Sequence, residues 1–231
     1  MGSTLAFLQA RIGSSRLPGK VLLKIGGKTI LERAIWRLRA ASAIDEVVVL
    51  TTTLDDDDPI VLEAERIEAP VHRGPELDVL KRFQQAARRF RPEIVIRSTA
   101  DNPLIDIGSV DRIVRAIRAS DLEFCMENSL PVGAATEAIT CDALEKSDQE
   151  ARDPAHREHV TLYVKENLNQ FRVAFLSPPD ALCRPDLRIT VDTPEDFLFV
   201  EDLILALPEG NHPLPLEQYL RVAEALMRAR T

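Results

Sequence analysis

Short apolar runs alternate with segments of helical periodicity through the first half of the chain. The apolar runs are rich in aliphatic residues and are bounded by polar loops, as expected of strands that are buried on both faces. They cover residues 5–8, 47–50 and 94–96, and the helical patterns between them cover residues 30–41, 60–67 and 77–90. This β-α-β-α order predicts an α/β fold with a largely parallel sheet and right-handed crossovers.

The pattern becomes looser after residue 120. The elements expected there are strands over residues 122–126, 171–176 and 187–191, helices near residues 141–150, 155–168 and 216–228, and an irregular stretch over residues 128–139. Pro194 and the two acids after it begin a further helix, because proline suits the first helical position and acids suit the first turn. We expect a single domain over residues 1–231, in which about residues 122–170 form a flap or a dimerisation insertion.

Composition and charge exclude several classes of protein. A chain of 231 residues with 45% hydrophobic residues suits one α/β domain with a sizeable core, and its apolar runs are too short to span a membrane. The first residues carry no basic segment followed by a long apolar stretch, so we expect a soluble protein of the cytoplasm that binds no membrane. The net charge of −8 argues against nucleic acid as a partner. The three cysteines are far apart and odd in number, which indicates reduced thiols and no zinc site.

Residues suited to binding an anion concentrate directly after the first apolar run. Residues 9–20 combine two glycines and two serines with three cations, Arg11, Arg16 and Lys20. Glycine lets backbone N–H groups approach an anion closely, the hydroxyls add donors, and the cations supply fixed positive charge. In an acidic chain this cluster indicates an anionic ligand such as a polyphosphate. Its spacing fits neither the P-loop nor the dinucleotide-binding G-x-G-x-x-G pattern.

Two aspartates follow predicted strands. Asp101 comes just after the strand over residues 94–96, and Asp192 comes after the strand over residues 187–191. Open α/β sheets bind ligands at the carboxyl ends of their strands, and Mg²⁺ is commonly held by one or two carboxylates together with substrate phosphates. Each aspartate also suits a purely structural role, in an Asx-turn for Asp101 and as a helix N-cap for Asp192 or Thr193. From the residues alone, the structural role of Asp101 is favoured.

The chain resembles the cytidylyltransferases that make CMP-activated sugars, above all the SpsF-like and acylneuraminate branch. Four segments carry the resemblance: Gln-Ala-Arg-x-Gly-Ser-x-Arg-Leu-Pro-Gly-Lys at residues 9–20, Arg-x-Thr-x-Asp-x-Pro-Leu-Ile-Asp at 97–106, Arg-Glu-His-Val-Thr-x-Tyr at 157–163 and Val-Asp-Thr-Pro-Glu-Asp at 191–196. The resemblance implies a three-layer, mostly parallel, Rossmann-like sheet of the nucleotidyltransferase (GT-A-like) type. It also implies that CMP passes from CTP to an acidic sugar or similar acceptor, with release of pyrophosphate, in surface polysaccharide or glycoconjugate biosynthesis.

The resemblance implies roles for individual residues as well. The loop over residues 9–20 would wrap the triphosphate of CTP, and Asp101 and Asp192 would ligate Mg²⁺. The catalytic residues would be Arg11, Lys20 and Asp101. The implied nucleotide-binding residues are Gln9, Ala10, Arg11, Gly13, Ser14, Ser15, Arg16, Lys20, Thr51, Arg73, Asp78, Thr99 and Ala100. The implied acceptor-binding residues are Gly133, Glu137, Arg157 and His159, of which Arg157 and His159 alternatively belong to a dimer contact. Resembling enzymes pair through the region that comprises the irregular stretch over residues 128–139 and the helices after residue 140, so we expect a homodimer.

Some positions depart from the family pattern and leave alternatives open. Ala100 replaces a glycine, Asn102 replaces a common cysteine, and Ala135 stands where an acid is frequent. The alternatives are an enzyme that uses another nucleoside triphosphate, one with a phosphate or phosphonate acceptor, and a nucleotide-binding protein that has lost catalysis. Retention of Lys20 and Asp101 argues against the last of these. The sequence shows no persuasive Ser/His/Asp or Cys/His set, and phosphoryl transfer requires positioning and charge neutralisation more than a protein base.

Overall fold

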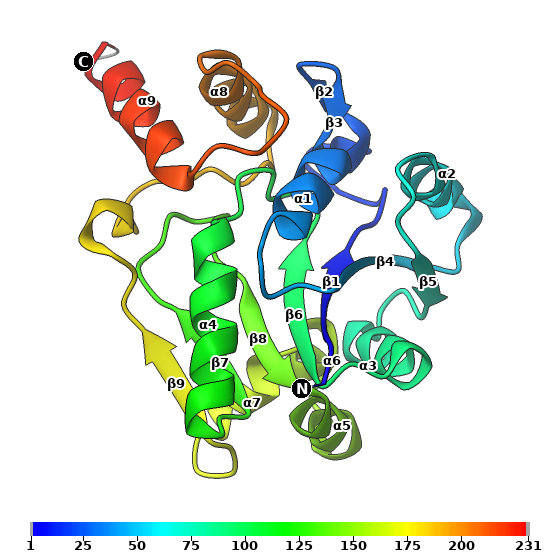
Figure 1. The fold of residues 1–231 in the computed structure, drawn as a ribbon. Helices are drawn as coiled ribbons and strands as arrows, with labels where there is room; N and C mark the ends of the chain where they lie inside the picture. Colours follow the sequence, from blue (N-terminus) through cyan, green and yellow to red (C-terminus); the bar gives the residue numbers. More distant parts are fainter. Residues whose placement is uncertain (1, 230–231) are drawn as a thin grey trace.

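A seven-stranded sheet forms the centre of the computed structural model, which describes residues 2–229 (Figure 1). The strands lie in the order β5-β4-β1-β6-β8-β7-β9. Their bounds are β1 Thr4–Gln9, β4 Glu46–Thr52, β5 Val71–Gly74, β6 Ile94–Thr99, β7 Phe124–Glu127, β8 Glu137–Thr140 and β9 Val173–Leu176. Strand β8 pairs antiparallel with both of its neighbours, and the other pairs in this sheet are parallel. The sheet is therefore mostly parallel, as predicted.

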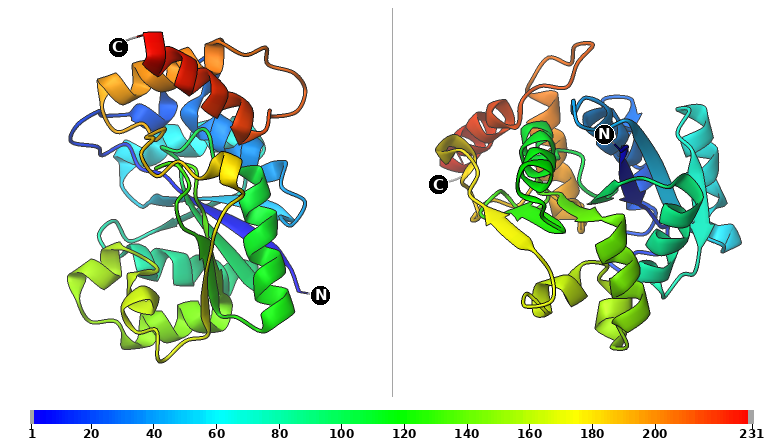
Figure 2. Two further views of the ribbon diagram at one scale, coloured as in Figure 1. Left: turned by 90° about the vertical axis from the view of Figure 1, so that its left-hand side faces the viewer. Right: turned by 60° about the horizontal axis from the view of Figure 1, so that its bottom comes forward.

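Helices cover both faces of the sheet and give the molecule three layers (Figures 1 and 2). Their bounds are α1 Ile30–Arg39, α2 Asp58–Arg66, α3 Val79–Phe90, α4 Ile107–Ser120, α5 Cys141–Glu150, α6 Pro154–Glu158, α7 Leu162–Glu166, α8 Pro194–Leu205 and α9 Leu216–Ala229. Helices α1, α2 and α4 pack on one face, and α3 and α5 pack on the other. Helices α8 and α9 lie over a third core at one end of the molecule. Among residues 2–229, no helix has the length and apolar character needed to cross a membrane.

The first strand shows why continuous apolar runs predicted strands here. In β1, Ala6 and Leu8 belong to the core beneath α1 and α4, whereas Leu5 and Phe7 belong to the core beneath α3. Successive side chains of a strand point to opposite faces of the sheet. A strand covered on both faces therefore needs an apolar residue at every position, and the three runs predicted in the first half are β1, β4 and β6.

The prediction of a strand over residues 187–191 is wrong. This segment makes one isolated bridge, between Val132 and Arg188, and it divides its backbone hydrogen bonds between two loops. The amide of Val191, for example, donates to the carbonyl of Asp101 (2.9 Å). The alternating apolar side chains of the segment fill the third core instead of a face of the sheet.

Two further expectations in the second half are corrected. The helix expected over residues 155–168 is two short helices, α6 and α7, because His159 leaves the helical region (φ −102°, ψ 88°). The stretch over residues 128–139, expected to be irregular, ends in strand β8, which pairs with β6 and β7. Residues 122–170 therefore supply two strands of the central sheet as well as helices α5, α6 and α7.

Candidate active site

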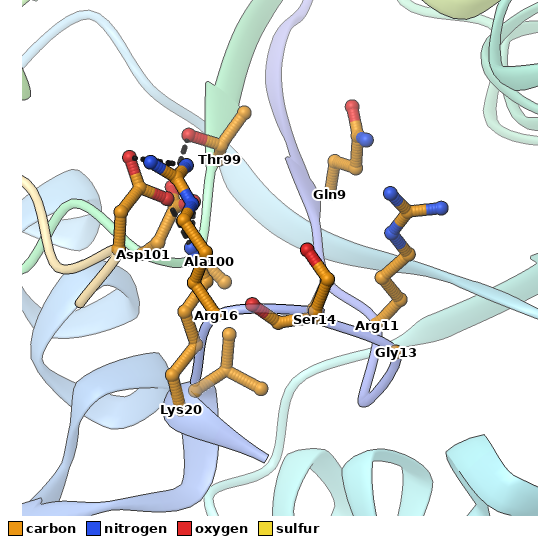
Figure 3. A pocket seen from close by; sticks show the side chains of 13 residues that line it. Gln9, Arg11, Gly13, Ser14, Arg16, Lys20, Thr99, Ala100 and Asp101 are labelled. Carbon is orange, nitrogen blue, oxygen red and sulfur yellow. Dashed lines mark hydrogen bonds and ion pairs between the residues drawn. The ribbon is translucent and has the colours of Figure 1, made fainter. Parts of the chain in front are cut away.

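A cavity of about 250 Å³ lies where the loop after β1 meets the end of β6 (Figure 3). Its lining residues are Gln9, Ala10, Arg11, Gly13, Ser14, Ser15, Arg16, Lys20, Val21, Thr99, Ala100, Asp101 and Asp192. The lining contains both predicted metal ligands. It also contains every predicted nucleotide-binding residue except Thr51, Arg73 and Asp78.

Backbone contacts hold the loop between β1 and Lys20. The amide of Ile12 donates to Asp57 (2.7 Å), and the amide of Gly19 donates to the carbonyl of Ile12 (3.1 Å). Gly19 adopts a left-handed conformation (φ 69°), which glycine takes without the steric cost of a Cβ. This turn begins the short 3₁₀ helix η1, Lys20–Leu22, and Lys20 becomes a buried residue in the cavity wall.

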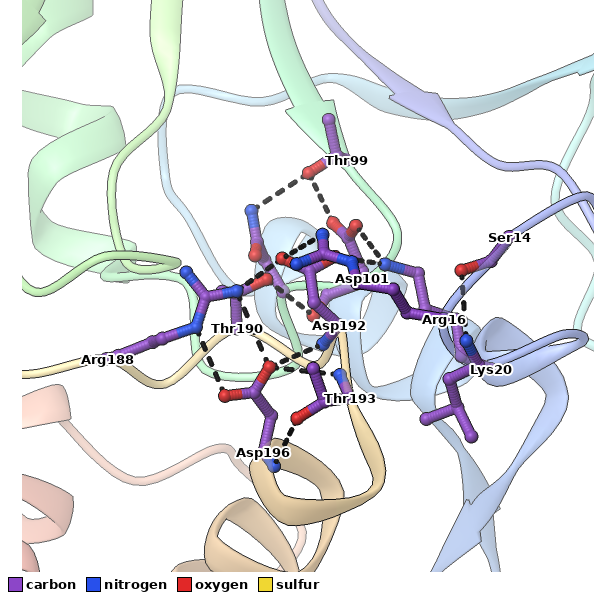
Figure 4. A network of polar contacts seen from close by, with 12 residues as sticks. Ser14, Arg16, Lys20, Thr99, Asp101, Arg188, Thr190, Asp192, Thr193 and Asp196 are labelled. Atoms are coloured by element: carbon purple, nitrogen blue, oxygen red, sulfur yellow. Dashed lines mark hydrogen bonds and ion pairs between the residues drawn. The ribbon is translucent and has the colours of Figure 1, made fainter.

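Lys20 bridges the two aspartates (Figure 4). Its Nζ lies 2.7 Å from Oδ2 of Asp101 and 2.7 Å from Oδ1 of Asp192. The other oxygen of Asp101 accepts from Oγ1 of Thr99 (2.6 Å), and that hydroxyl accepts from Asn102 (2.9 Å). Two carboxylates that are distant in the sequence therefore meet at a single cationic atom.

The start of helix α8 holds Asp192 in place. Thr193 and Asp196 form a capping box, and Oδ2 of Asp196 also accepts from the amide of Asp192 (2.9 Å). Arg188 forms ion pairs with both Asp192 and Asp196. Burial opposes the ionisation of Asp192, but Lys20 and Arg188 outweigh it, so the pKa of Asp192 is lowered. No role was predicted for Arg188, although this residue begins the matching segment that contains Asp192.

The pair formed by Asp101 and Asp192 has the donor chemistry of a magnesium site. Two carboxylate oxygens from different loops face one cation, each at 2.7 Å, beside an open cavity. Mg²⁺ is commonly held by one or two carboxylates and completes its shell with water and substrate phosphates. Within residues 2–229, no cluster of three or more His, Cys, Asp or Glu side chains is arranged to hold a metal ion. The two aspartates therefore fit a metal that arrives with a phosphate ligand.

A second cavity, of about 270 Å³, adjoins the first. Gln9 and Arg11 line both cavities. The other residues of the second cavity come from the loop before α3, from the first residue of α3 and from α6, namely Glu76, Leu77, Val79, Pro154 and Glu158. None of these five was predicted to line a binding site, because only the packing of α6 against α3 brings the two segments together.

Three residues predicted to bind the nucleotide lie outside the first cavity. Thr51 is buried in β4. Arg73 donates to the backbone carbonyl of Thr52 (2.7 Å), at the end of β4, and to that of Leu54 (2.6 Å), in the loop that follows. Asp78 caps α3 and forms a two-bond ion pair with Arg157, at 2.9 and 2.8 Å. Arg73 therefore holds the loop after β4, and Asp78 holds the segment that lines the second cavity.

Glu137, predicted to bind the acceptor, is a buried carboxylate with protein partners. It accepts from Arg97 (3.0 Å) and Thr161 (2.8 Å), and it also pairs with Lys165. Burial opposes its ionisation, but the charges of Arg97 and Lys165 outweigh burial and lower the pKa of Glu137. The carboxylate therefore fixes two cations in place.

The other predicted acceptor residues contact different parts of the chain. Gly133 has a φ of 99°, and a Cβ there would lie 2.6 Å from the amide nitrogen of Thr190, so glycine is required for this close approach. Arg157 pairs with Asp78 at the border of the second cavity. His159 is exposed and lines neither of the two cavities.

Comparison with known proteins identifies relatives over most of the chain. Residues 5–228 match the model of a protein family described as cytidylyltransferase. An uncharacterized protein of Methanocaldococcus jannaschii is 39% identical over 85% of this chain and 82% of its own length. The spore coat polysaccharide biosynthesis protein SpsF of Bacillus subtilis is 33% identical over 88% of this chain and 87% of its own length. The structure of a cytidylyltransferase from Leptospira borgpetersenii superposes with a TM-score of 0.88 at 30% identity, covering 98% of this chain and 94% of that one.

Proposed function

We propose that this chain, which belongs to the cytidylyltransferase family, transfers CMP from CTP to an acidic sugar or similar acceptor and releases pyrophosphate. Membership of this family makes it a nucleotidyltransferase. The observation that carries the proposal is that three cations and two carboxylates line one cavity at the ends of β1 and β6. A triphosphate requires such cations, and the metal that accompanies it requires such oxygen ligands. The likeness to SpsF supports a place in surface polysaccharide or glycoconjugate biosynthesis.

The loop over residues 9–20 would hold the triphosphate. Arg11, Arg16 and Lys20 line the first cavity and would neutralise the phosphate charge. The glycines of the loop allow backbone N–H groups to reach the phosphate oxygens. Fixed donors of this kind position the α-phosphate for attack and stabilise the charge that develops in the transition state.

The second cavity would hold the cytidine. A nucleotide whose phosphates lie in the first cavity extends past Gln9 and Arg11, the two residues that line both cavities. The carboxylates of Glu76 and Glu158 line the second cavity. A carboxylate accepts a hydrogen bond from the amino group of cytosine, whereas uracil presents a carbonyl oxygen at the same position. This difference supports CTP over UTP as the substrate.

Asp101 and Asp192 would hold the magnesium ion. Thr99 fixes the carboxylate of Asp101, and Asp196 fixes the backbone of Asp192, so both ligands are positioned by the protein. When bound, the ion would offset the negative charge that builds on the phosphoryl oxygens.

An acidic acceptor would find cations next to the first cavity. Arg97 lies two residues before Thr99 on β6, so both side chains point to the same face of the sheet, and Thr99 lines the cavity. Glu137 ties Arg97 to Lys165. We place the acidic group of the acceptor toward these two cations, with Glu137 as the residue that holds them. Gly133, Arg157 and His159 line neither cavity, and their acceptor roles stay predictions.

The reaction needs no covalent intermediate on the protein. The acceptor oxygen attacks the α-phosphorus of CTP while its proton passes to water, and the bond to the bridging oxygen of pyrophosphate breaks. Arg11, Arg16 and Lys20 would stabilise the leaving pyrophosphate. Positioning and charge neutralisation account for most of the catalysis in phosphoryl transfer, which suits a site built from cations and carboxylates.

The region after residue 140 would join two copies of the chain into a homodimer. Strand β9 lies at the edge of the central sheet, where its outer backbone groups face no described strand of that sheet. Phe175 on this strand is 42% exposed, and Leu168 in the preceding loop is 47% exposed. An exposed edge with apolar side chains favours pairing with another chain.

The deciding experiment measures pyrophosphate release with each of the common nucleoside triphosphates and with a panel of acidic sugars, sugar phosphates and phosphonates. We expect release with CTP and an acidic sugar such as N-acetylneuraminate or 3-deoxy-manno-octulosonate, and a large loss in Asp101→Asn. Preference for another triphosphate, or for a phosphate or phosphonate acceptor, would replace the proposal with that alternative. Binding of CTP without release for any acceptor would identify a protein that has lost catalysis.

A further inference from the structure

Lys20 stands between the two carboxylates that the proposed metal would need. Its Nζ lies 2.7 Å from an oxygen of Asp101 and 2.7 Å from an oxygen of Asp192. The Lys20 side chain is 10% exposed, whereas those of Asp101 and Asp192 are 24% and 21% exposed. The ammonium is therefore the most enclosed of the three groups.

The remaining oxygens of the two carboxylates are engaged as well. Oδ1 of Asp101 accepts from Thr99 (2.6 Å), and Oδ2 of Asp192 pairs with two arginines. A metal ion that takes the two facing oxygens must therefore compete with Lys20 for the same lone pairs. A divalent cation and an ammonium at such short range also repel each other.

We propose that Lys20 is the counter-ion of the metal site and prevents metal binding until a nucleoside triphosphate arrives. This role rests on the proposed function, because magnesium and CTP are the ligands involved. Lys20 lines the same cavity as Ser14 and Arg16, where the triphosphate would lie. Its flexible four-carbon stem lets the ammonium turn from the carboxylates to the phosphates. The triphosphate draws Lys20 away and brings further oxygen ligands, so metal and nucleotide bind together.

This exchange keeps the negative charge of the two carboxylates balanced by a cation both before and after the nucleotide binds. Asp101 and Asp192 are partly buried, and two such carboxylates without a shared cation would repel each other and destabilise the fold. Lys20 supplies the charge before the nucleotide binds, and the metal supplies it afterwards. Removing Lys20 therefore exposes two ionised ligands to any divalent ion in solution.

Manganese provides a direct probe of this exchange, because binding of Mn²⁺ is measured by electron paramagnetic resonance without nucleotide or turnover. We expect Lys20→Met to bind Mn²⁺ at least about tenfold more tightly than the wild-type protein, because the competing cation is gone. Lys24→Met removes the same charge from an exposed position on the β2 strand, Lys24–Ile25, and should bind Mn²⁺ as the wild type does. The gain should disappear when Asp101→Asn is added to Lys20→Met.

Lys20→Gln serves as a second variant that keeps a hydrogen-bond donor at this position, in case Lys20→Met does not fold. The melting temperature of either variant should rise with Mn²⁺ by more than that of the wild type, since ligand binding to the folded state stabilises it. Equal Mn²⁺ affinity in the wild type and in a folded Lys20 variant would overturn the role of Lys20. A gain that survives Asp101→Asn would do the same. Neither readout uses CTP, so failure of the exchange is distinct from failure of the proposed reaction, which pyrophosphate release tests.

Discussion

Asp101 and Asp192 should behave as one functional unit when each is replaced by asparagine. Both carboxylates contact the same Nζ of Lys20 at 2.7 Å, and the amide of Val191 donates to the carbonyl of Asp101 (2.9 Å), so their two loops are joined. Asparagine keeps the shape of the side chain and removes its charge. Each single substitution therefore removes one ligand from the same proposed metal site.

The size of the effect separates a shared site from two independent ones. Loss of one positioned electrostatic contact in an active site costs about 3–4 kcal/mol of transition-state stabilisation, or about 10²–10³-fold in turnover. Independent roles would multiply to about 10⁴–10⁶-fold in the double variant. A shared site is already disabled by the first substitution, so the double variant should lose about as much as the worse single variant. The coupling energy expected between the two positions is thus about 3–4 kcal/mol.

The assay is pyrophosphate release at saturating CTP and Mg²⁺, with the acceptor that the panel identifies. Thermal melting of each variant establishes that the loss is not unfolding. Asp180→Asn, which removes a carboxylate from an exposed position, is the matched control and should retain full turnover. Losses that multiply in the double variant, or full activity in both single variants, would refute the shared-site assignment.

Three other predictions address the triphosphate loop, the buried carboxylate and the assembly. Lys20→Ala should remove about 2–4 kcal/mol of transition-state stabilisation while the chain remains folded, which is measured as a lower kcat/KM for CTP. An unchanged kcat/KM would remove Lys20 from the site. Glu137→Gln should lower the free energy of unfolding by about 1–3 kcal/mol at neutral pH, because it removes the charge that the partly exposed cations Arg97 and Lys165 share. The folded-state pKa of Glu137 is lowered, so this stabilisation is complete above the unfolded-state pKa and is lost as the pH falls through the folded-state pKa. Denaturant titrations should therefore show the difference from wild type shrinking toward acid pH, and a constant difference would contradict this. Light scattering at micromolar concentration should give a homodimer, and a monomer would disprove the pairing.

The first half of the fold could be predicted from local pattern because each strand is buried on both faces. The runs over residues 5–8 and 47–50 are interior parts of β1 and β4, and the run over residues 94–96 is the first half of β6. The helices that follow these strands also carry local start signals. Asp78, for example, caps α3 because its carboxylate accepts from the amide of Lys81. In this region the information that defines an element lies within the element itself.

The second half was harder to predict because its elements depend on distant partners. Residues 187–191 alternate apolar and polar positions as a strand does, but their apolar side chains pack against α8 and α9. Among residues 2–229 their one bridge is to Val132, which lies outside the strands. Strand β8 follows a stretch that contains Pro131 and Gly133, and only its pairing with β6 and β7 reveals it. The second cavity likewise depends on the packing of α6 against α3.

The segment that carries Asp192 shows how a helix start and a binding site share the same residues. The sequence left two roles open for Asp192, N-cap of α8 or ligand. Thr193 is the N-cap in the structure, and Oδ2 of Asp196 accepts from the amides of both Asp192 (2.9 Å) and Thr193 (3.0 Å). The capping box therefore also fixes the backbone of Asp192, and the positive N-terminal end of α8 favours an ionised carboxylate nearby. Because Thr193 takes the capping role, the carboxylate of Asp192 can turn to Lys20 and the cavity.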